Sequence, residues 1–180
     1  MSNFRFIEKN LDVSKILQQV LDNSGDWKYV NNLKSDGKDV GGDLDPYGFL
    51  PLVMAVVKPG ESPKNTEKTQ KTELYDKYDE VSKWLRSQGI TQLSRAAFFK
   101  LGIDEWVGKH IDEGTYYLSR DRYHLSLQGS YDYEVDGEWH TIEPGTFFWF
   151  DNKKYHQAHN VGDVERITFV FDVPKSEDNP

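Results

Sequence analysis

From Ser94 onward the apolar residues of this chain recur at roughly every second position, in short runs separated by turn residues. A period of two is typical of strands with one buried face, and such strands without intervening helices argue against a doubly wound sheet. The runs cover residues 95–101, 106–111, 122–127, 131–135, 138–142, 146–150 and 164–173. Asp136-Gly137 predicts a tight hairpin, because both positions tolerate positive φ. We therefore expect a sandwich or small barrel of antiparallel strands.

The first 93 residues follow a different pattern. Residues 11–23 and 72–87 carry apolar side chains at helical spacing, and Gly89 stands where a left-handed cap would end the second helix. Short apolar runs predict strands at 27–30 and 48–57, whereas the polar stretch 59–70 predicts an exposed loop. The length favours one domain over residues 1–180. Within it we expect a helical and loop-rich part at 1–93, a strand-rich catalytic core at 94–174 and a disordered tail at 175–180.

Charge and composition exclude several classes of partner and site. The net charge is −8 and the pI is near 5.1, so we expect neither nucleic acid nor an anionic membrane as a partner. Cysteine is absent, so His and carboxylate side chains would have to hold any transition metal. No basic leader and no stretch of about 20 apolar residues is present. These features predict a cytoplasmic protein.

All five histidines lie in the strand-rich half, and His110-Ile111-Asp112 is the most specific feature among them. Side chains two apart on an extended chain project to the same side, so His110 and Asp112 can hold one ion together. A histidine near position 156 would complete a two-His-one-carboxylate set, which leaves three positions of an octahedral iron open. Taken alone, the tripeptide is more often a surface histidine followed by a turn-forming aspartate.

Two further strands carry polar residues where a core is expected. Arg122, His124 and Ser126 share one face of their strand, and a buried polar row needs a partner. The two negative charges of a keto acid would supply one. Arg166 stands at the mouth of an apolar strand, where its planar fork suits a carboxylate. The alternative for Arg166 is a surface ion pair with a neighbouring acidic residue.

The stretch from His110 to Asp172 resembles the aspartyl/asparaginyl β-hydroxylase and proline hydroxylase group of iron(II)/2-oxoglutarate dioxygenases. In chain order the matching motifs are His110-Ile111-Asp112, Arg122-Tyr123-His124-Leu125, Gly145 through Phe150-Asp151, His156, Asn160, Arg166 and Phe171-Asp172. Their order and spacing together carry the resemblance. It implies a mainly β protein with a double-stranded β-helix, a jelly-roll or cupin-like barrel, and N-terminal helices packed outside it.

The resemblance also implies a role for each matching residue. The implied iron(II) ligands and catalytic centre are His110, Asp112 and His156, with Arg166 on the distal carboxylate of 2-oxoglutarate and Arg122 and His124 at its metal-proximal end. His156 is preferred to His159 because the family places this ligand ten residues before the arginine. On an extended strand, residues 156 and 159 also face opposite ways.

The implied reaction consumes O2 and 2-oxoglutarate, releases succinate and CO2, and hydroxylates an amino acid or an Asp, Asn or Pro side chain in a peptide. A small molecule or a peptide is thus the expected partner, with substrate contacts among residues 26–47, 59–70 and 115–117. The alternative is a cupin-like protein, such as an isomerase or a sensor, that binds a metal or small ligand without oxygen chemistry. The fold does not separate the two. Arg166 and Arg122 favour the oxygenase.

Overall fold

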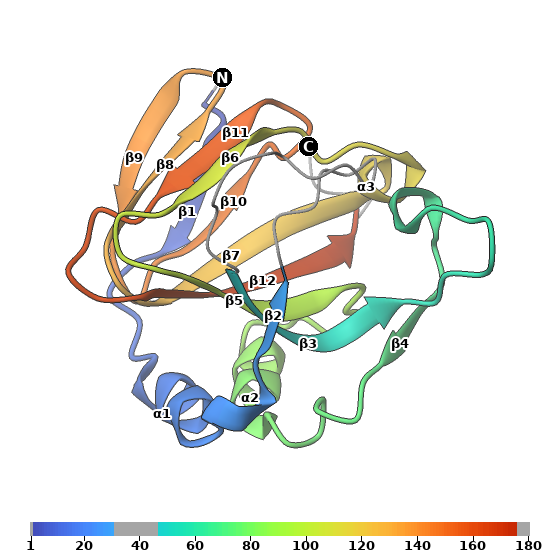
Figure 1. Ribbon diagram of the computed structural model, residues 1–180, viewed down its shortest axis with the longest axis horizontal. Coiled ribbons are helices and arrows are strands. Elements are labelled where there is room, and N and C mark those ends of the chain that lie inside the picture. The colour runs from blue at the N-terminus through green and yellow to red at the C-terminus, as the bar shows by residue number, and fades with distance from the viewer. Residues whose placement is uncertain (1, 31–46, 176–180) are drawn as a thin grey trace.

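The computed structural model describes residues 2–30 and 47–175. Most of the loop expected over 26–47, and all but the first residue of the tail expected over 175–180, lie outside these ranges. The described strands form two antiparallel sheets, and the helices lie outside them, as Figure 1 shows. No helix in the described ranges is long and apolar enough to cross a bilayer.

The larger sheet takes its strands from nearly the whole length of the chain. Its order is β1 (Phe4–Glu8), β10 (Phe147–Phe150), β7 (Arg120–Gln128), β12 (Arg166–Pro174), β5 (Ala96–Leu101), β3 (Tyr47–Ala55) and β2 (Lys28–Val30), and β4 (Thr69–Lys71) pairs with β3. The smaller sheet has the order β6 (Trp106–His110), β11 (His156–His159), β8 (Tyr131–Val135) and β9 (Glu138–Ile142). Strands β8 and β9 form the predicted hairpin, with positive φ at both Asp136 and Gly137.

Two helices cover one face of the larger sheet. They are α1 (Ser14–Asp22) and α2 (Asp79–Ser87), which lie together below β3 and β5 in Figure 1. Their apolar faces bury Ile16 and Val20 from α1 and Val81 and Leu85 from α2. The remaining helical elements are short: α3 (Thr115–Leu118) and the 3-10 turns η1 (Ser24–Asp26) and η2 (Pro63–Asn65).

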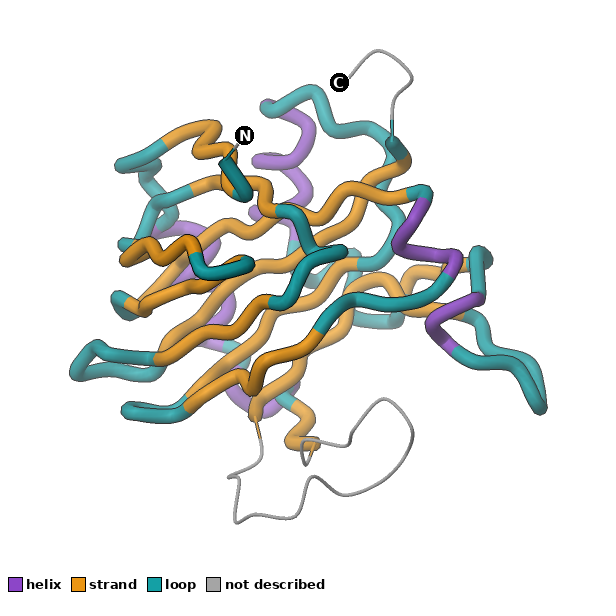
Figure 2. Tube along the Cα trace, turned by 90° about the horizontal axis from the view of Figure 1, so that it is seen from above, coloured by secondary structure: helices purple, strands orange, loops and turns teal. Residues whose placement is uncertain are grey.

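The larger sheet separates two apolar cores, and β7 contributes to both sides. Leu125 and Leu127 belong to the core between this sheet and the helices. His124, on the opposite face of β7, contacts the rings of Phe148 and Phe150 in the core between the sheets. Figure 2 shows the strands lying side by side across the molecule. The alternation of β7 therefore places the predicted polar row inside the barrel.

The sequence does not predict β1, β4 or β11. Each is short, and its few residues show too little periodicity to be recognised without a clear turn signal such as the one between β8 and β9. Their pairing partners lie elsewhere in the chain: β10 for β1, β3 for β4, and both β6 and β8 for β11. Tertiary pairing thus decides their conformation.

Two other expectations need correction. The stretch 59–70 is not simply an exposed loop, because it contains η2, Thr66 is buried, and the Arg95 guanidinium donates to the carbonyls of Pro63 and Thr66. The helix expected over 72–87 begins only at Asp79. The reason is that the Thr72 hydroxyl accepts from the N–H of Leu74 and holds a turn before the helix.

Candidate metal centre

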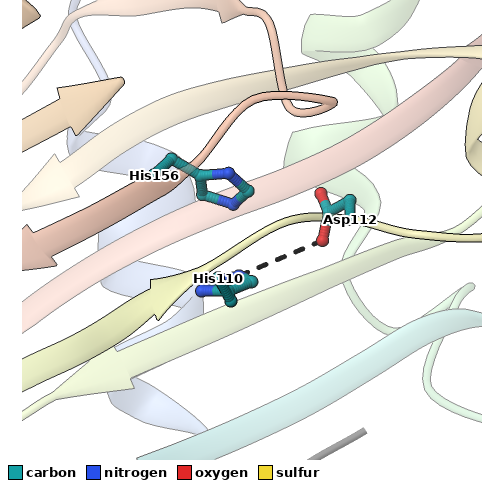
Figure 3. Close-up of side chains that lie close together, drawn as sticks. All are labelled: His110, Asp112 and His156. Atoms are coloured by element: carbon teal, nitrogen blue, oxygen red, sulfur yellow. Dashed lines mark ion pairs between the residues drawn. The ribbon is translucent and has the colours of Figure 1, made fainter. Parts of the chain in front are cut away.

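Strand pairing brings the three predicted ligands together. Strands β6 and β11 are antiparallel neighbours with His110 opposite His156, and Asp112 follows two residues after His110. The ligand atoms of the three side chains all lie within 4.8 Å of one another. Figure 3 shows His110, Asp112 and His156 arranged around a common space, with the dashed line joining His110 and Asp112.

Hydrogen bonds to the backbone orient both imidazoles. Nδ1 of His110 lies 2.7 Å from the carbonyl oxygen of Gly108, and Nδ1 of His156 lies 2.9 Å from that of Lys154. A carbonyl can only accept, so each Nδ1 carries the hydrogen and each Nε2 keeps its lone pair. Nε2 of His110 is 4.0 Å from Oδ1 of Asp112. Two imidazoles and one carboxylate in this arrangement suit a single transition metal ion such as iron(II).

The electrostatics of the site favour the protonation states that a metal needs. Burial would raise the pKa of the Asp112 carboxyl, but the charge of Arg122, the two histidines and the hydrogen bond from Asn152 together outweigh it and hold that pKa below its usual range. Burial, aided by His110, lowers the pKa of His156 to about 4. Near neutral pH Asp112 is therefore an anion and His156 a neutral imidazole, as metal coordination requires.

The second oxygen of Asp112 is occupied by other side chains. Oδ2 accepts from Nη1 of Arg122 and from Nδ2 of Asn152, each at 2.8 Å. Arg122 also donates from Nε and Nη2 to the two oxygens of Asp172, at 2.8 and 3.0 Å. The cosubstrate contact expected for Arg122 stays a prediction, and in the structure its guanidinium lies between two carboxylates.

Arg166 has a different environment. It is buried at 4% exposure, its Nε donates to the Thr168 hydroxyl, and its guanidinium lies 4.2 Å from the centre of the Tyr131 ring. The neighbouring acidic residue Glu165 pairs with Lys100, and among residues 2–30 and 47–175 no carboxylate lies within ion-pair distance of Arg166. A buried guanidinium without an anion is unfavourable, so this position fits an anionic ligand.

Polar atoms without partners surround Arg166. Within the described part of the chain, the Ser126 hydroxyl, the Tyr131 hydroxyl and Nδ1 of His124 are buried without a hydrogen bond. Ser126 lies opposite Thr168 in the pairing of β7 with β12. Burial, with the charges of Arg166 and Arg122, holds the pKa of His124 well below its usual range, so His124 is neutral. Unpaired buried donors beside a guanidinium are suited to a carboxylate ligand.

Other residues singled out by the sequence lie outside this centre. His159 hydrogen-bonds Asp104 and stacks on Trp106, and His140 hydrogen-bonds Glu138. Asn160, which belongs to the family motif, donates its amide to the carbonyls of Leu101, Gly102 and Val164 and so closes a loop.

Sequence reasoning does not find Asn152 or Tyr116 as neighbours of the site. Asn152 lies in the turn after β10. Tyr116 lies in α3, and its hydroxyl donates to Asp172 over 3.1 Å. An asparagine after Asp151 carries an ordinary turn signal, and Tyr116 belongs to a stretch that was only a candidate substrate loop. In the sequence, the aspartate at position 172 directly after an apolar run is a signal that points to a buried charge partner.

Comparison with known structures identifies one that shares the barrel fold. An oxidoreductase of the 2OG-Fe(II) oxygenase family from Burkholderia pseudomallei aligns with a TM-score of 0.66 and 13% identity, over 96% of this chain and 85% of that chain. A predicted oxalate decarboxylase from Thermotoga maritima aligns with a TM-score of 0.47 and 13% identity, over 83% of this chain and 92% of that one. The first of these alignments, with the two antiparallel sheets and the helices outside them, confirms the predicted cupin-like double-stranded β-helix with outer helices. No curated protein sequence matches the chain.

The sequence also matches a family model, that of aspartyl/asparaginyl beta-hydroxylase, over residues 9–176. The match begins just after β1 and continues past the end of β12, so it includes every other strand of both sheets and every residue of the metal centre. The donor set around His156 and the unpaired Arg166 agree with this assignment. The chain therefore belongs to the aspartyl/asparaginyl β-hydroxylase family.

Proposed function

We propose that this protein is an iron(II)- and 2-oxoglutarate-dependent dioxygenase that hydroxylates an amino acid, or an Asp, Asn or Pro side chain in a peptide. One observation carries the proposal. His110, Asp112 and His156 converge in a barrel whose interior also holds Arg166, a buried guanidinium with no carboxylate partner among the described residues.

His110, Asp112 and His156 would hold the iron through two Nε2 atoms and Oδ1. When bound, iron(II) activates O2 for attack on an unactivated carbon–hydrogen bond. The chain contributes orientation, because the carbonyls of Gly108 and Lys154 fix the two rings. His156 is 2% exposed and the side chain of Asp112 is 9% exposed, which limits water access from the barrel side.

Arg166 would bind the distal carboxylate of 2-oxoglutarate. Its Nε is engaged by Thr168, so Nη1 and Nη2 remain for the ligand, and the free hydroxyls of Ser126 and Tyr131 would add hydrogen bonds. Because the ring of His124 is neutral, it would add no charge beside the bound cosubstrate. In the overall reaction one oxygen atom enters the substrate as a hydroxyl and the other enters succinate, while CO2 leaves.

The direct test is to add iron(II) and 2-oxoglutarate to the protein without oxygen and to record the weak visible charge-transfer absorption. Succinate release is then measured in air with a panel of free amino acids and of peptides containing Asp, Asn or Pro. We expect the absorption in the natural protein and in His159→Ala, whose ring lies outside the centre, and its loss in His156→Ala.

Two outcomes would contradict the proposal. Absorption that persists in His156→Ala would exclude these ligands. Metal binding without 2-oxoglutarate binding would favour the cupin-like protein that uses its barrel for a small ligand.

A further inference from the structure

Four charged or polar side chains form a buried chain behind the metal centre. Asp112 contacts Arg122, Arg122 contacts Asp172 through two hydrogen bonds, and Asp172 accepts from the Tyr116 hydroxyl. Asp172 is 1% exposed and Tyr116 is fully buried. Arg122 has 18% side-chain exposure. These contacts are direct, and they link β12 and α3 to the ligand carboxylate.

The segment after β6 is attached to Asp172 at two points. One attachment runs through Arg122 to Asp112, and the other through Tyr116, which lies in α3 only four residues further along the chain. The backbone N–H of Arg95 donates to the Tyr116 oxygen, and the Arg95 guanidinium lies 3.6 Å from the centre of the same ring. Figure 1 shows α3 beside the start of β7 and the end of β12.

The hydrogen bonds to Asp112 leave only one of its oxygens for a metal. Oδ2 already accepts two donors at 2.8 Å, Arg122 and Asn152, which fill both of its lone pairs. Oδ1 faces His110 at 4.0 Å. A carboxylate held in this way can bind a metal through one oxygen and cannot turn to bind through two.

We infer that Arg122, anchored by Asp172, is a positioning residue that holds Asp112 as a ligand through one oxygen. This inference rests on the proposed function, since it assumes a metal at His110, Asp112 and His156. It differs from the cosubstrate contact expected for Arg122. By restricting Asp112 to one oxygen, Arg122 keeps a coordination position open that a carboxylate bound through both oxygens would occupy.

A role of Arg122 through charge repulsion and a role in orienting Asp112 predict opposite changes in metal affinity when Arg122 is replaced, which makes the inference testable. If Arg122 acted on the metal only by charge repulsion, removing its charge would strengthen the binding of a divalent cation at a pH where Asp112 remains ionised. If it acts by orienting Asp112, removing it weakens metal binding, because partners that orient a ligand typically contribute about 10- to 100-fold in affinity. Lysine keeps the charge but lacks the planar fork that contacts both carboxylates.

The experiment measures Mn(II) affinity from the electron paramagnetic resonance signal of free Mn(II). We expect Arg122→Lys and Arg122→Met each to bind Mn(II) about 10- to 100-fold more weakly than the natural protein. Arg86→Met is the control, since Arg86 is exposed in the last turn of α2, a helix outside the barrel. We expect it to keep the natural affinity. The ligand-field absorption of Co(II) should change in the Arg122 variants and not in the control.

Circular dichroism establishes that each variant is folded before it is titrated. Arg122→Lys retains the buried charge balance, so it decides the question if Arg122→Met does not fold. Unchanged affinity in Arg122→Lys, or tighter binding in Arg122→Met, overturns the positioning role while leaving the metal site intact. Mn(II) binding that is unaffected by His156→Ala instead overturns the proposed function, and the inference with it.

Discussion

Two arginines enter the barrel from neighbouring strands, and their partners set them apart. Arg122 lies between Asp112 and Asp172, so its charge is more than balanced by the protein itself. Arg166 lies against Tyr131 and Thr168, and none of the described residues offers it a carboxylate. The same residue type therefore serves two purposes. One guanidinium is a fixed part of the structure, and the other is suited to an incoming anion.

The first prediction concerns Arg166. Arg166→Met should raise the half-saturating concentration of 2-oxoglutarate about 100-fold or more, since losing one member of a buried charge pair costs about 3 to 5 kcal/mol and about 1.4 kcal/mol corresponds to a factor of ten. The measurement is a 2-oxoglutarate titration followed by the visible absorption of the anaerobic iron(II) protein. Mn(II) affinity should stay within a few-fold of the natural value, which separates cosubstrate binding from the metal site. An unchanged titration would exclude Arg166 as the carboxylate contact.

The ligands of the site follow from the sequence more readily than the residues that support them. His110 and Asp112 are two apart on a strand, so their common side can be predicted from local geometry. His156 needed the family resemblance, because no local pattern links it to His110. Asn152 and Tyr116 could not be predicted, because their positions depend on how a turn and a short helix pack against β7 and β12.

At the scale of elements, a hydrogen-bonded carboxylate fixes the N-terminal strand. Glu138, in β9, accepts from the Ser2 hydroxyl, the Asn3 N–H and the His140 ring. The Ser2 and Asn3 hydrogen bonds, with that of His140, lower the pKa of Glu138 to about 2. These contacts join the start of β1 to the smaller sheet, although β1 itself pairs with the larger one.

The second prediction concerns this contact and its pH dependence. Because the pKa of Glu138 is lower in the folded protein than its ordinary value of 4.5, its stabilisation is fully present above about pH 4.5 and is lost as the pH falls toward 2. Glu138→Gln should lower the free energy of unfolding by about 1 kcal/mol at pH 7. Urea unfolding at several pH values should show this difference shrinking between pH 4.5 and 2. A difference that grows with acid would contradict the assignment.

The third prediction concerns the turn between β6 and α3. Gly114 has φ of 115°, and a Cβ at this position would overlap the carbonyl oxygen of Lys64. Gly114→Ala should therefore lower the free energy of unfolding by about 1 to 3 kcal/mol. It should also weaken Mn(II) binding, since Asp112 lies two residues before it. Gly25→Ala is the control, because a Cβ there meets nothing within 4 Å and no positive φ is involved.

Helix α1 and most strands of the C-terminal half could be predicted, whereas β1, β4 and β11 could not. Strands β5, β7, β8, β9, β10 and β12 and helix α1 match their expected ranges to within a few residues. The stretch 72–78 has helical spacing but forms turns, because Thr72 competes for the backbone through its hydroxyl. Strand β11 is defined only by its neighbours β6 and β8, which no local pattern reveals.

At the scale of the whole molecule, the metal centre joins segments that are far apart in the chain. His110 comes from β6 and His156 from β11, both in the smaller sheet, whereas Arg122 and Asp172 belong to β7 and β12 of the larger sheet. A metal at this centre would thus bind only the folded barrel. The mainly antiparallel architecture could be predicted from the two-residue spacing of apolar residues and from the turn residues. The order of the strands could not, because it depends on pairing between distant segments.

The fourth prediction follows from this coupling. A metal ion that binds only the folded state, at a concentration 100 times its dissociation constant, should raise the free energy of unfolding by about 2.7 kcal/mol. The measurement compares urea unfolding with and without Mn(II) in the natural protein. His156→Ala should remove the increase, and His159→Ala should retain it. An equal increase in both variants would mean that the ion acts elsewhere on the protein.

The pairing of β1 with β10 has a consequence beyond the fold itself. Strand β10 has the sequence Phe147-Phe148-Trp149-Phe150, and β1 supplies its outer neighbour, with Phe4 opposite Phe150 and Phe6 opposite Phe148. Without β1, four consecutive aromatic residues would present unpaired backbone groups that another molecule could extend into an intermolecular sheet. A chain shortened by its first eight residues should therefore self-associate. Strand β1 thus protects β10 from intermolecular pairing.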